Sequence, residues 1–164
     1  GPGPGGEALS QKPLVPLIAS TYIDREPLFS PDGTRILFSS TRTGQQAIWR
    51  ADRDGSNQIQ LVSSEGIRYG SARWAPDGQW IVFDGSSQGN SDLYLASSEG
   101  GSPQQLTSGA ASDFRPSFSR DGRWIYFSSP GHDVGNMHDL YRVRPEGGPP
   151  VDVSAQKTAM NKSS

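Results

Sequence analysis

The chain has 164 residues, 15 basic and 17 acidic side chains and no cysteine, and its net charge of -2 argues against a nucleic-acid or anionic-lipid surface. Hydrophobic residues make up only 32% of the chain, which is low for a conventional globular core. The 20 glycines and 13 prolines favour many turns and little helix, so we expect an all-β fold without membrane insertion.

The first 20 residues contain no complete structural unit. Residues 1–12 lack an initiating Met and the apolar core of a signal peptide, so we expect a linker or an expression remnant there. Residues 13–20, PLVPLIAS, form the longest apolar run, but it is too short to span a bilayer and is interrupted by Pro16. Its spacing from Phe29 matches that of later outer strands from their aromatic residues. We therefore expect residues 13–20 to be the outermost strand of a preceding unit.

Three turns of similar sequence follow along the chain. They end at Gly33, Gly78 and Gly122, which are spaced by 45 and 44 residues. In SPDG, Pro presets φ at the second turn position, Asp suits the third, and Gly accepts the positive φ that closes the turn. Such a period is typical of the four-stranded blades of a β-propeller. Two sets of aromatic residues keep this period before and after each glycine: Phe29, Trp74 and Phe118; Phe38, Phe83 and Phe127. Another aromatic follows each glycine by sixteen to nineteen residues, at Trp49, Tyr94 and Tyr141.

Each repeat contains four expected strands. The second strands, RILFS, WIVFD and WIYFS, are apolar on both faces, whereas a sheet with one solvated face would alternate. Third strands follow at AIWRA, DLYLA and DLYRV, and glycine turns lead into fourth strands at QIQLV, PQQLT and PVDVS. We therefore predict three blades of four antiparallel strands at residues 21–63, 64–108 and 109–154, with a flexible tail at 155–164.

The stretch FSPDGTRILFSSTRTGQQAIWRADRDGSNQIQLV resembles the propeller repeat of the TolB-like family. That repeat carries a Pro-Asp-Gly turn, an Ile-x-Phe second strand and an Asp-Gly third turn. The resemblance covers residues 21–154 and departs at Arg120, which replaces the turn proline. It implies a bacterial propeller that binds partners, and it favours a periplasmic or other extracytoplasmic location.

Three blades do not close a ring. Natural propellers have roughly 4 to 8 blades, so we expect either a segment of a longer propeller or one half of a composite ring. In both cases the terminal blades would have bare faces, and exposed apolar patches drive association. We therefore predict self-association through the exposed blade faces, for example into a two-chain, six-bladed ring.

Propeller ligands usually meet the mouth of the central channel, although this is an analogy at the level of the fold. The loops that reach the mouth join fourth to first strands and second to third strands. Mixed charges and an aromatic ring suit a peptide or a small polar ligand, whereas the alternative is solvated loops with local Arg–Asp pairs. The candidate binding residues in these loops are Arg25, Glu26, Arg68, Tyr69, Asp113, Arg115, His132 and His138.

Other motifs favour turns over chemistry. The His-Asp pairs at 132–133 and 138–139 offer metal-ligating groups, but their spacing matches no tight ligand pattern, so we predict no metal and no cofactor. Residues 52–57 are similar to the start of a calcium loop but lack the later Glu ligand. Residues 85–89 match the nucleophile-elbow pattern, which needs a helix where a strand is expected here. We therefore predict no catalytic site in this chain.

These observations favour a non-catalytic binding or scaffold module that presents channel-mouth loops to a protein or a small polar ligand. The resemblance implies alternatives. Similar propellers form accessory parts of prolyl-oligopeptidase-like or tricorn-like serine peptidases and sensory domains of bacterial regulators. Related propellers in sugar-acid lyases carry metal-bound histidines.

Overall fold

The computed structural model describes residues 16–130 and 138–154. These residues form three antiparallel sheets of four strands, here called blades 1 to 3, and contain no helix. Blade 1 comprises β1 (Asp24–Phe29), β2 (Arg35–Ser40), β3 (Ala47–Asp52) and β4 (Ile59–Val62). Blade 2 comprises β5 (Arg68–Trp74), β6 (Trp80–Ser87), β7 (Asn90–Ser97) and β8 (Gln104–Gln105). Blade 3 comprises β9 (Phe114–Phe118), β10 (Ile125–Pro130), β11 (His138–Val143) and β12 (Val151–Asp152).

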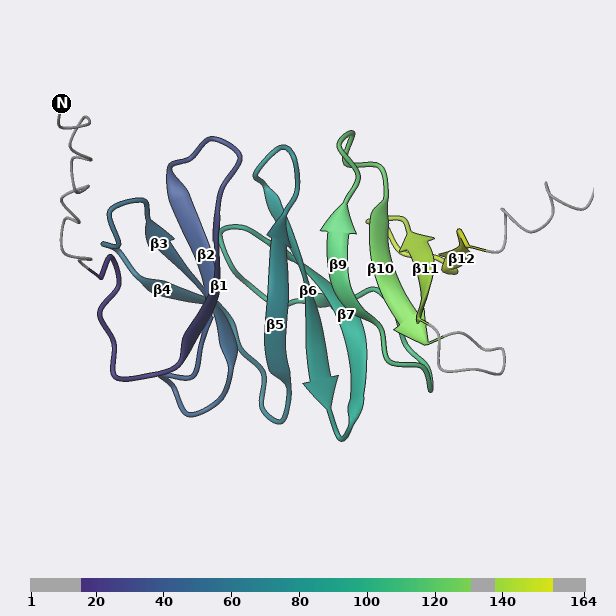
Figure 1. Cartoon of the computed structure of the whole chain (residues 1–164), viewed down its shortest axis with the longest axis horizontal. Helices are drawn as coiled ribbons and strands as arrows, with labels where there is room; N and C mark the ends of the chain where they lie inside the picture. Colours follow the sequence, from purple (N-terminus) through teal and green to yellow (C-terminus); the bar gives the residue numbers. More distant parts are fainter. Residues whose placement is uncertain (1–15, 131–137, 155–164) are drawn as a thin grey trace, which may run out of the picture.

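Within each blade the strands pair in chain order, so every blade is a simple meander. Figure 1 shows the three sheets side by side in sequence order along the long axis of the molecule. Blade 2 lies in the middle, because β5 contacts β1 on one side and β9 on the other. The predicted architecture of three four-stranded propeller blades is therefore confirmed.

The repeated turns have the geometry that their sequence predicts. The glycines at their ends, Gly33, Gly78 and Gly122, have φ values of 70°, 70° and 71°. In the first turn, Asp32 Oδ1 accepts hydrogen bonds from the Ser30 hydroxyl at 2.6 Å and the Thr34 amide at 3.0 Å. These bonds lower the pKa of Asp32 to about 2. Asp121 accepts the equivalent bonds in the third turn, which explains why Arg120 replaces the turn proline without changing the fold.

The hydrophobic core lies between the blades. One cluster joins Leu37 and Ile48 of blade 1 to Ile81 and Phe83 of blade 2, and a second cluster joins blades 2 and 3. The second strands of blades 1 and 2 are buried on both faces, as their continuous apolar sequences predict. In blade 3, Ile125 and Phe127 are buried but Tyr126 on the other face is only half-buried, because no further described blade covers that face. In each blade the phenylalanine of the second strand also stacks on the aromatic residue of the third, in the pairs Phe38–Trp49, Phe83–Tyr94 and Phe127–Tyr141.

Residues 16–20, part of the expected outer strand 13–20, form no strand, because no third strand of the described residues lies beside them to share hydrogen bonds. Leu17 nevertheless lies where an outer strand of a preceding blade would lie. A Cβ at Gly55 would overlap the carbonyl oxygen of Leu17, and a Cβ at Gly100 would lie 3.2 Å from that of Leu61 in β4. Leu17 therefore contacts blade 1 in the way that Leu61 contacts blade 2.

Candidate ligand-binding face

A β-bulge interrupts the first strand of every blade at the same position. The residues at these bulges, Glu26, Ser71 and Arg115, have φ values of 56°, 51° and 54°. A positive φ is uncommon outside glycine, and bulges redirect side chains near functional sites. Such backbone outliers cluster at ligand sites, so the aligned bulges favour a binding site at the first strands.

Carboxylates of the preceding blade satisfy two of the bulge amides. Glu26 Oε2 accepts a hydrogen bond from the Ser71 amide at 2.8 Å, and Asp84 Oδ2 accepts one from the Arg115 amide at 3.0 Å. A bulge leaves an amide without its partner in the strand ladder, and each carboxylate supplies the missing acceptor. These two bonds therefore fix the register between neighbouring blades at the first strands.

The two carboxylates also lie near each other. A Cβ at Gly70 would lie 3.6 Å from Glu26 Oε2 and 3.5 Å from Asp84 Oδ1, so the carboxylates flank this glycine. Burial raises the pKa of Asp84, and the negative charge of Glu26 raises it further, whereas the bond from the Arg115 amide lowers it. Because both groups are engaged with the backbone, we assign them a structural role.

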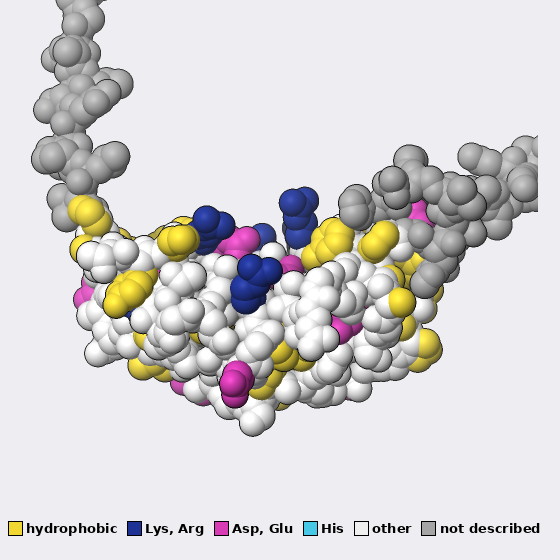
Figure 2. All heavy atoms as spheres, turned by 90° about the horizontal axis from the view of Figure 1, so that it is seen from below, with side chains coloured by type: hydrophobic (Ala, Val, Ile, Leu, Met, Phe, Trp, Pro, Cys, Tyr) yellow, Lys and Arg dark blue, Asp and Glu magenta, His cyan; other side chains and the backbone are white. Residues whose placement is uncertain are grey.

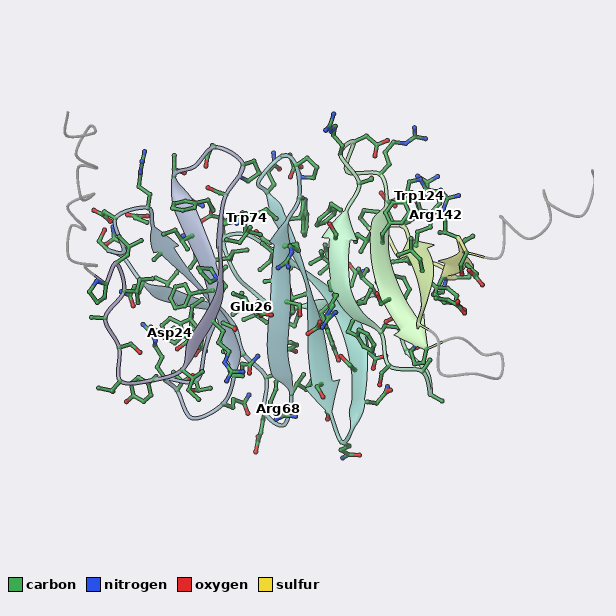
Figure 3. The ribbon with its side chains drawn as sticks, in the orientation of Figure 1. Asp24, Glu26, Arg68, Trp74, Trp124 and Arg142 are labelled. Atoms are coloured by element: carbon green, nitrogen blue, oxygen red, sulfur yellow. The ribbon has the colours of Figure 1, made fainter. Side chains whose placement is uncertain are left out.

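Three arginines on the first strands have no partner within the part of the chain that the structure describes. The side chains of Arg25, Arg68 and Arg115 are exposed, and no hydrogen bond or ion pair joins their guanidinium groups to any described residue. Figure 2 views the end of the molecule where the channel-mouth loops lie and shows basic and acidic side chains gathered on its hollowed side. In Figure 3, Arg68 lies at this end of β5, below Glu26. The first strand of each blade therefore presents one exposed guanidinium group, and that of Arg25 lies beside the hollow that Phe29 also lines.

Other predicted site residues lie elsewhere. Tyr69 is fully buried, with its ring edge-on to Phe83 at 5.1 Å and its hydroxyl 3.0 Å from Ser64 Oγ, so it is a core residue that offers no surface to a ligand. Asp113 is also buried, and its amide donates to the Ser91 carbonyl at 2.7 Å. His132 lies outside the described residues. His138 begins β11, paired with Pro130, and its side chain is not described.

The motifs that resemble chemical sites form hairpins in the structure. The Asp52–Asn57 stretch contains the β3–β4 turn, where Asn57 Nδ2 donates to Asp52 Oδ2 at 2.6 Å. The 85–89 stretch joins β6 directly to β7, with no helix to lift Ser87. Among residues 16–130 and 138–154, no three His, Asp or Glu side chains lie together as metal ligands. The same ranges contain no helix long and apolar enough to cross a membrane.

Comparison with known proteins agrees with this architecture. Residues 43–164, most of the chain, match the family described as the Tricorn protease N-terminal beta propeller domain. The chain belongs to that family. Over 38 residues it is also 50% identical to the uncharacterized protein Atu1656 of Agrobacterium fabrum, which corresponds to 23% of this chain and 13% of that protein.

Solved structures show the same similarity. A TolB-assigned structure from Agrobacterium tumefaciens has 26% identity and a TM-score of 0.65, over 76% of this chain and 46% of that one. TolB from Acinetobacter baumannii has 25% identity and a TM-score of 0.63, over 77% of this chain and 31% of that one. Puromycin hydrolase, at 19% identity and a TM-score of 0.63, shares the fold over 79% of this chain and 22% of its own length. The chain thus spans less than half the length of these proteins.

Proposed function

We propose that this propeller domain is a non-catalytic binding module whose hollowed side receives an acidic segment of a protein partner. The observation that carries the proposal is the set of three exposed guanidinium groups, at Arg25, Arg68 and Arg115, that contact no partner in residues 16–130 and 138–154. Arginine binds carboxylates through paired N–H donors, and three arginines on adjacent blades offer several such contacts at once. The carboxylates of Glu26 and Asp84 accept bonds from bulge amides, and among the described residues neither forms an ion pair with these arginines.

A labelled hexaglutamate peptide tests this proposal by fluorescence anisotropy. Replacing Arg25, Arg68 and Arg115 together with alanine removes about 0.2–1 kcal/mol per exposed charge contact, so we expect affinity to fall roughly three- to hundredfold. The matched control replaces Arg53, Arg120 and Arg123, which are exposed on turns at the opposite end. This control changes the net charge equally and should bind like the parent chain. Equal loss in both variants, or tight binding of hexaglutamine, would contradict the proposal.

A second candidate function follows from the family match. The Tricorn protease propeller is, by its description, the N-terminal domain of a protease, which supports an accessory role beside a hydrolase domain in a longer protein. The same fold also suits a sensory domain of a regulator. The ligand could equally be a small polar molecule in place of an acidic peptide. The intact mass of the native protein, followed by a peptidase assay on it, distinguishes the accessory role from a stand-alone binding module.

We further infer that the end faces of the array mediate self-association. Phe29 on blade 1 is 55% exposed, beside a hollow of about 390 Å³, and Leu140 on blade 3 is 45% exposed. A second copy would bury both faces. Sedimentation equilibrium should show a concentration-dependent dimer, and a monomer at all concentrations would contradict this inference. An extracytoplasmic location, which the TolB resemblance favours, remains part of the same proposal.

A further inference from the structure

The groove between blades 1 and 2 contains an ion cluster at the end opposite the channel mouth. Glu99, in the turn after β7, forms ion pairs with Arg35 of β2 and with Arg50 of β3, the latter at 2.9 Å. Arg50 also donates to the Ser98 carbonyl at 2.6 Å. A glutamate from the later blade thus binds two guanidinium groups of the earlier one.

The groove between blades 2 and 3 keeps the glutamate but lacks both arginines. Glu146 precedes the turn glycine of blade 3, as Glu99 does in blade 2. Arg35 lies two residues after the turn glycine of blade 1, and Trp80 lies at the same position in blade 2. Likewise, Leu95 of β7 occupies the position in blade 2 that Arg50 of β3 occupies in blade 1. No hydrogen bond or ion pair joins the Glu146 side chain to any described residue.

A groove of about 450 Å³ is open at this place. Trp80, which is 45% exposed, Leu95 and Phe118 form its apolar wall, and the charged residues that line it are Asp77, Asp121 and Glu146. All three are acidic. Hydrogen bonds from Ser119 and the Arg123 amide lower the pKa of Asp121, so its carboxylate is ionised at neutral pH. An aromatic face beside carboxylates is the arrangement that binds organic cations.

Blade 3 shows what a tryptophan at this repeat position binds. Trp124 is equivalent to Trp80, and its ring carries the guanidinium groups of Arg142 at 4.1 Å and Arg144 at 3.8 Å. Figure 3 shows Trp124 and Arg142 side by side on blade 3. The repeat thus binds guanidinium through this tryptophan in one blade and through the turn glutamate in another. Of the two grooves between the described blades, the one between blades 2 and 3 combines both groups with an open space.

We propose that the groove formed by Trp80 and Glu146 is a second binding site, which takes an arginine side chain of a protein partner. The guanidinium plane stacks on the Trp80 ring, and its N–H groups donate to Glu146 and the neighbouring carboxylates. The site lies at the opposite end of the domain from the arginines of the hollowed side, and its ligand has the opposite charge.

Isothermal titration of the whole chain with acetylated, amidated tri-arginine tests this site. The same peptide made with citrulline, which keeps the shape but removes the charge, should bind at least about tenfold more weakly. Trp80→Ala and Glu146→Gln should each weaken tri-arginine binding by about three- to thirtyfold. Asp54→Asn, at the equivalent turn position in blade 1, is the matched control and should leave the affinity unchanged.

Three results would overturn the proposal. They are equal binding of the arginine and citrulline peptides, parental affinity in both groove variants, and trilysine binding as tight as that of tri-arginine. Glu146→Gln preserves the side-chain shape at an exposed position, so it reports on binding even if Trp80→Ala reduces stability. The variant lacking Arg25, Arg68 and Arg115 should bind tri-arginine like the parent chain, which separates this site from the hollowed side.

Discussion

Gly85 provides a direct test of how the blades pack. It lies in β6, and a Cβ there would stand 2.7 Å from ring carbons of both Tyr69 and Tyr94 and 2.9 Å from Ile67 Cγ2. Real Cβ atoms do not approach so closely, and the two rings cannot move away because both are buried. Gly85→Ala should therefore destabilise the chain by about 1–3 kcal/mol through overpacking. This is opposite in sign to the gain of about 0.5–1 kcal/mol that alanine usually gives over glycine inside a strand.

Urea denaturation followed by tryptophan fluorescence measures this difference, and each kcal/mol should lower the melting temperature by roughly 2–4 °C. Ser86→Ala, one residue along and on the other face of β6, is the control and should change stability by less than about 0.5 kcal/mol. If Gly85→Ala were as stable as the parent chain, Tyr69 and Tyr94 could not pack against β6 as described.

Two further predictions concern charges between blades. Burial raises the pKa of Asp84 above its ordinary value of 3.8, so the folded chain should lose stability as pH rises from about 4 through the raised pKa. Asp84→Asn keeps an acceptor for the Arg115 amide. Denaturation at pH 3.5 should show equal stability of the variant and the parent chain, and denaturation at pH 7 should show that the variant is more stable. A variant less stable than the parent at pH 7 would contradict this. Glu99→Gln removes a carboxylate that is 63% exposed, so it should cost about 0.5–1 kcal/mol at low salt and much less in 1 M NaCl. A cost independent of salt would show that the Arg35 and Arg50 pairs are not the cause.

The blades were predictable from sequence because their determinants are local. The turn glycines, the apolar second strands and the aromatic stacks each depend on residues close together in one repeat. Phe38, for example, keeps the same spacing from the turn glycine as its counterparts Phe83 and Phe127 in the other blades. Periodicity of this kind specifies strands and turns before any contact between blades is known.

The contacts between blades were not predictable in the same way. Glu26, Ser71 and Arg115 adopt positive φ without the glycine or asparagine that usually marks such a position. The sequence predicts that Tyr69 lies in the loop between a fourth and a first strand, but β5 already begins at Arg68, and Phe83 and Tyr94 of the same blade enclose the Tyr69 ring. A comparison of the three repeats would have distinguished Asp84, because Ser39 and Ser128 occupy the equivalent positions in blades 1 and 3.

The central claim is that ligands bind on the hollowed side, at the first strands. Amide chemical-shift mapping with the hexaglutamate peptide tests this most directly, because it reports where the ligand lies. We predict shifts concentrated at Arg25, Ser71 and Arg115, with none at the outer strands β4 and β8. Shifts confined to the outer strands or to the exposed faces of blades 1 and 3 would contradict it.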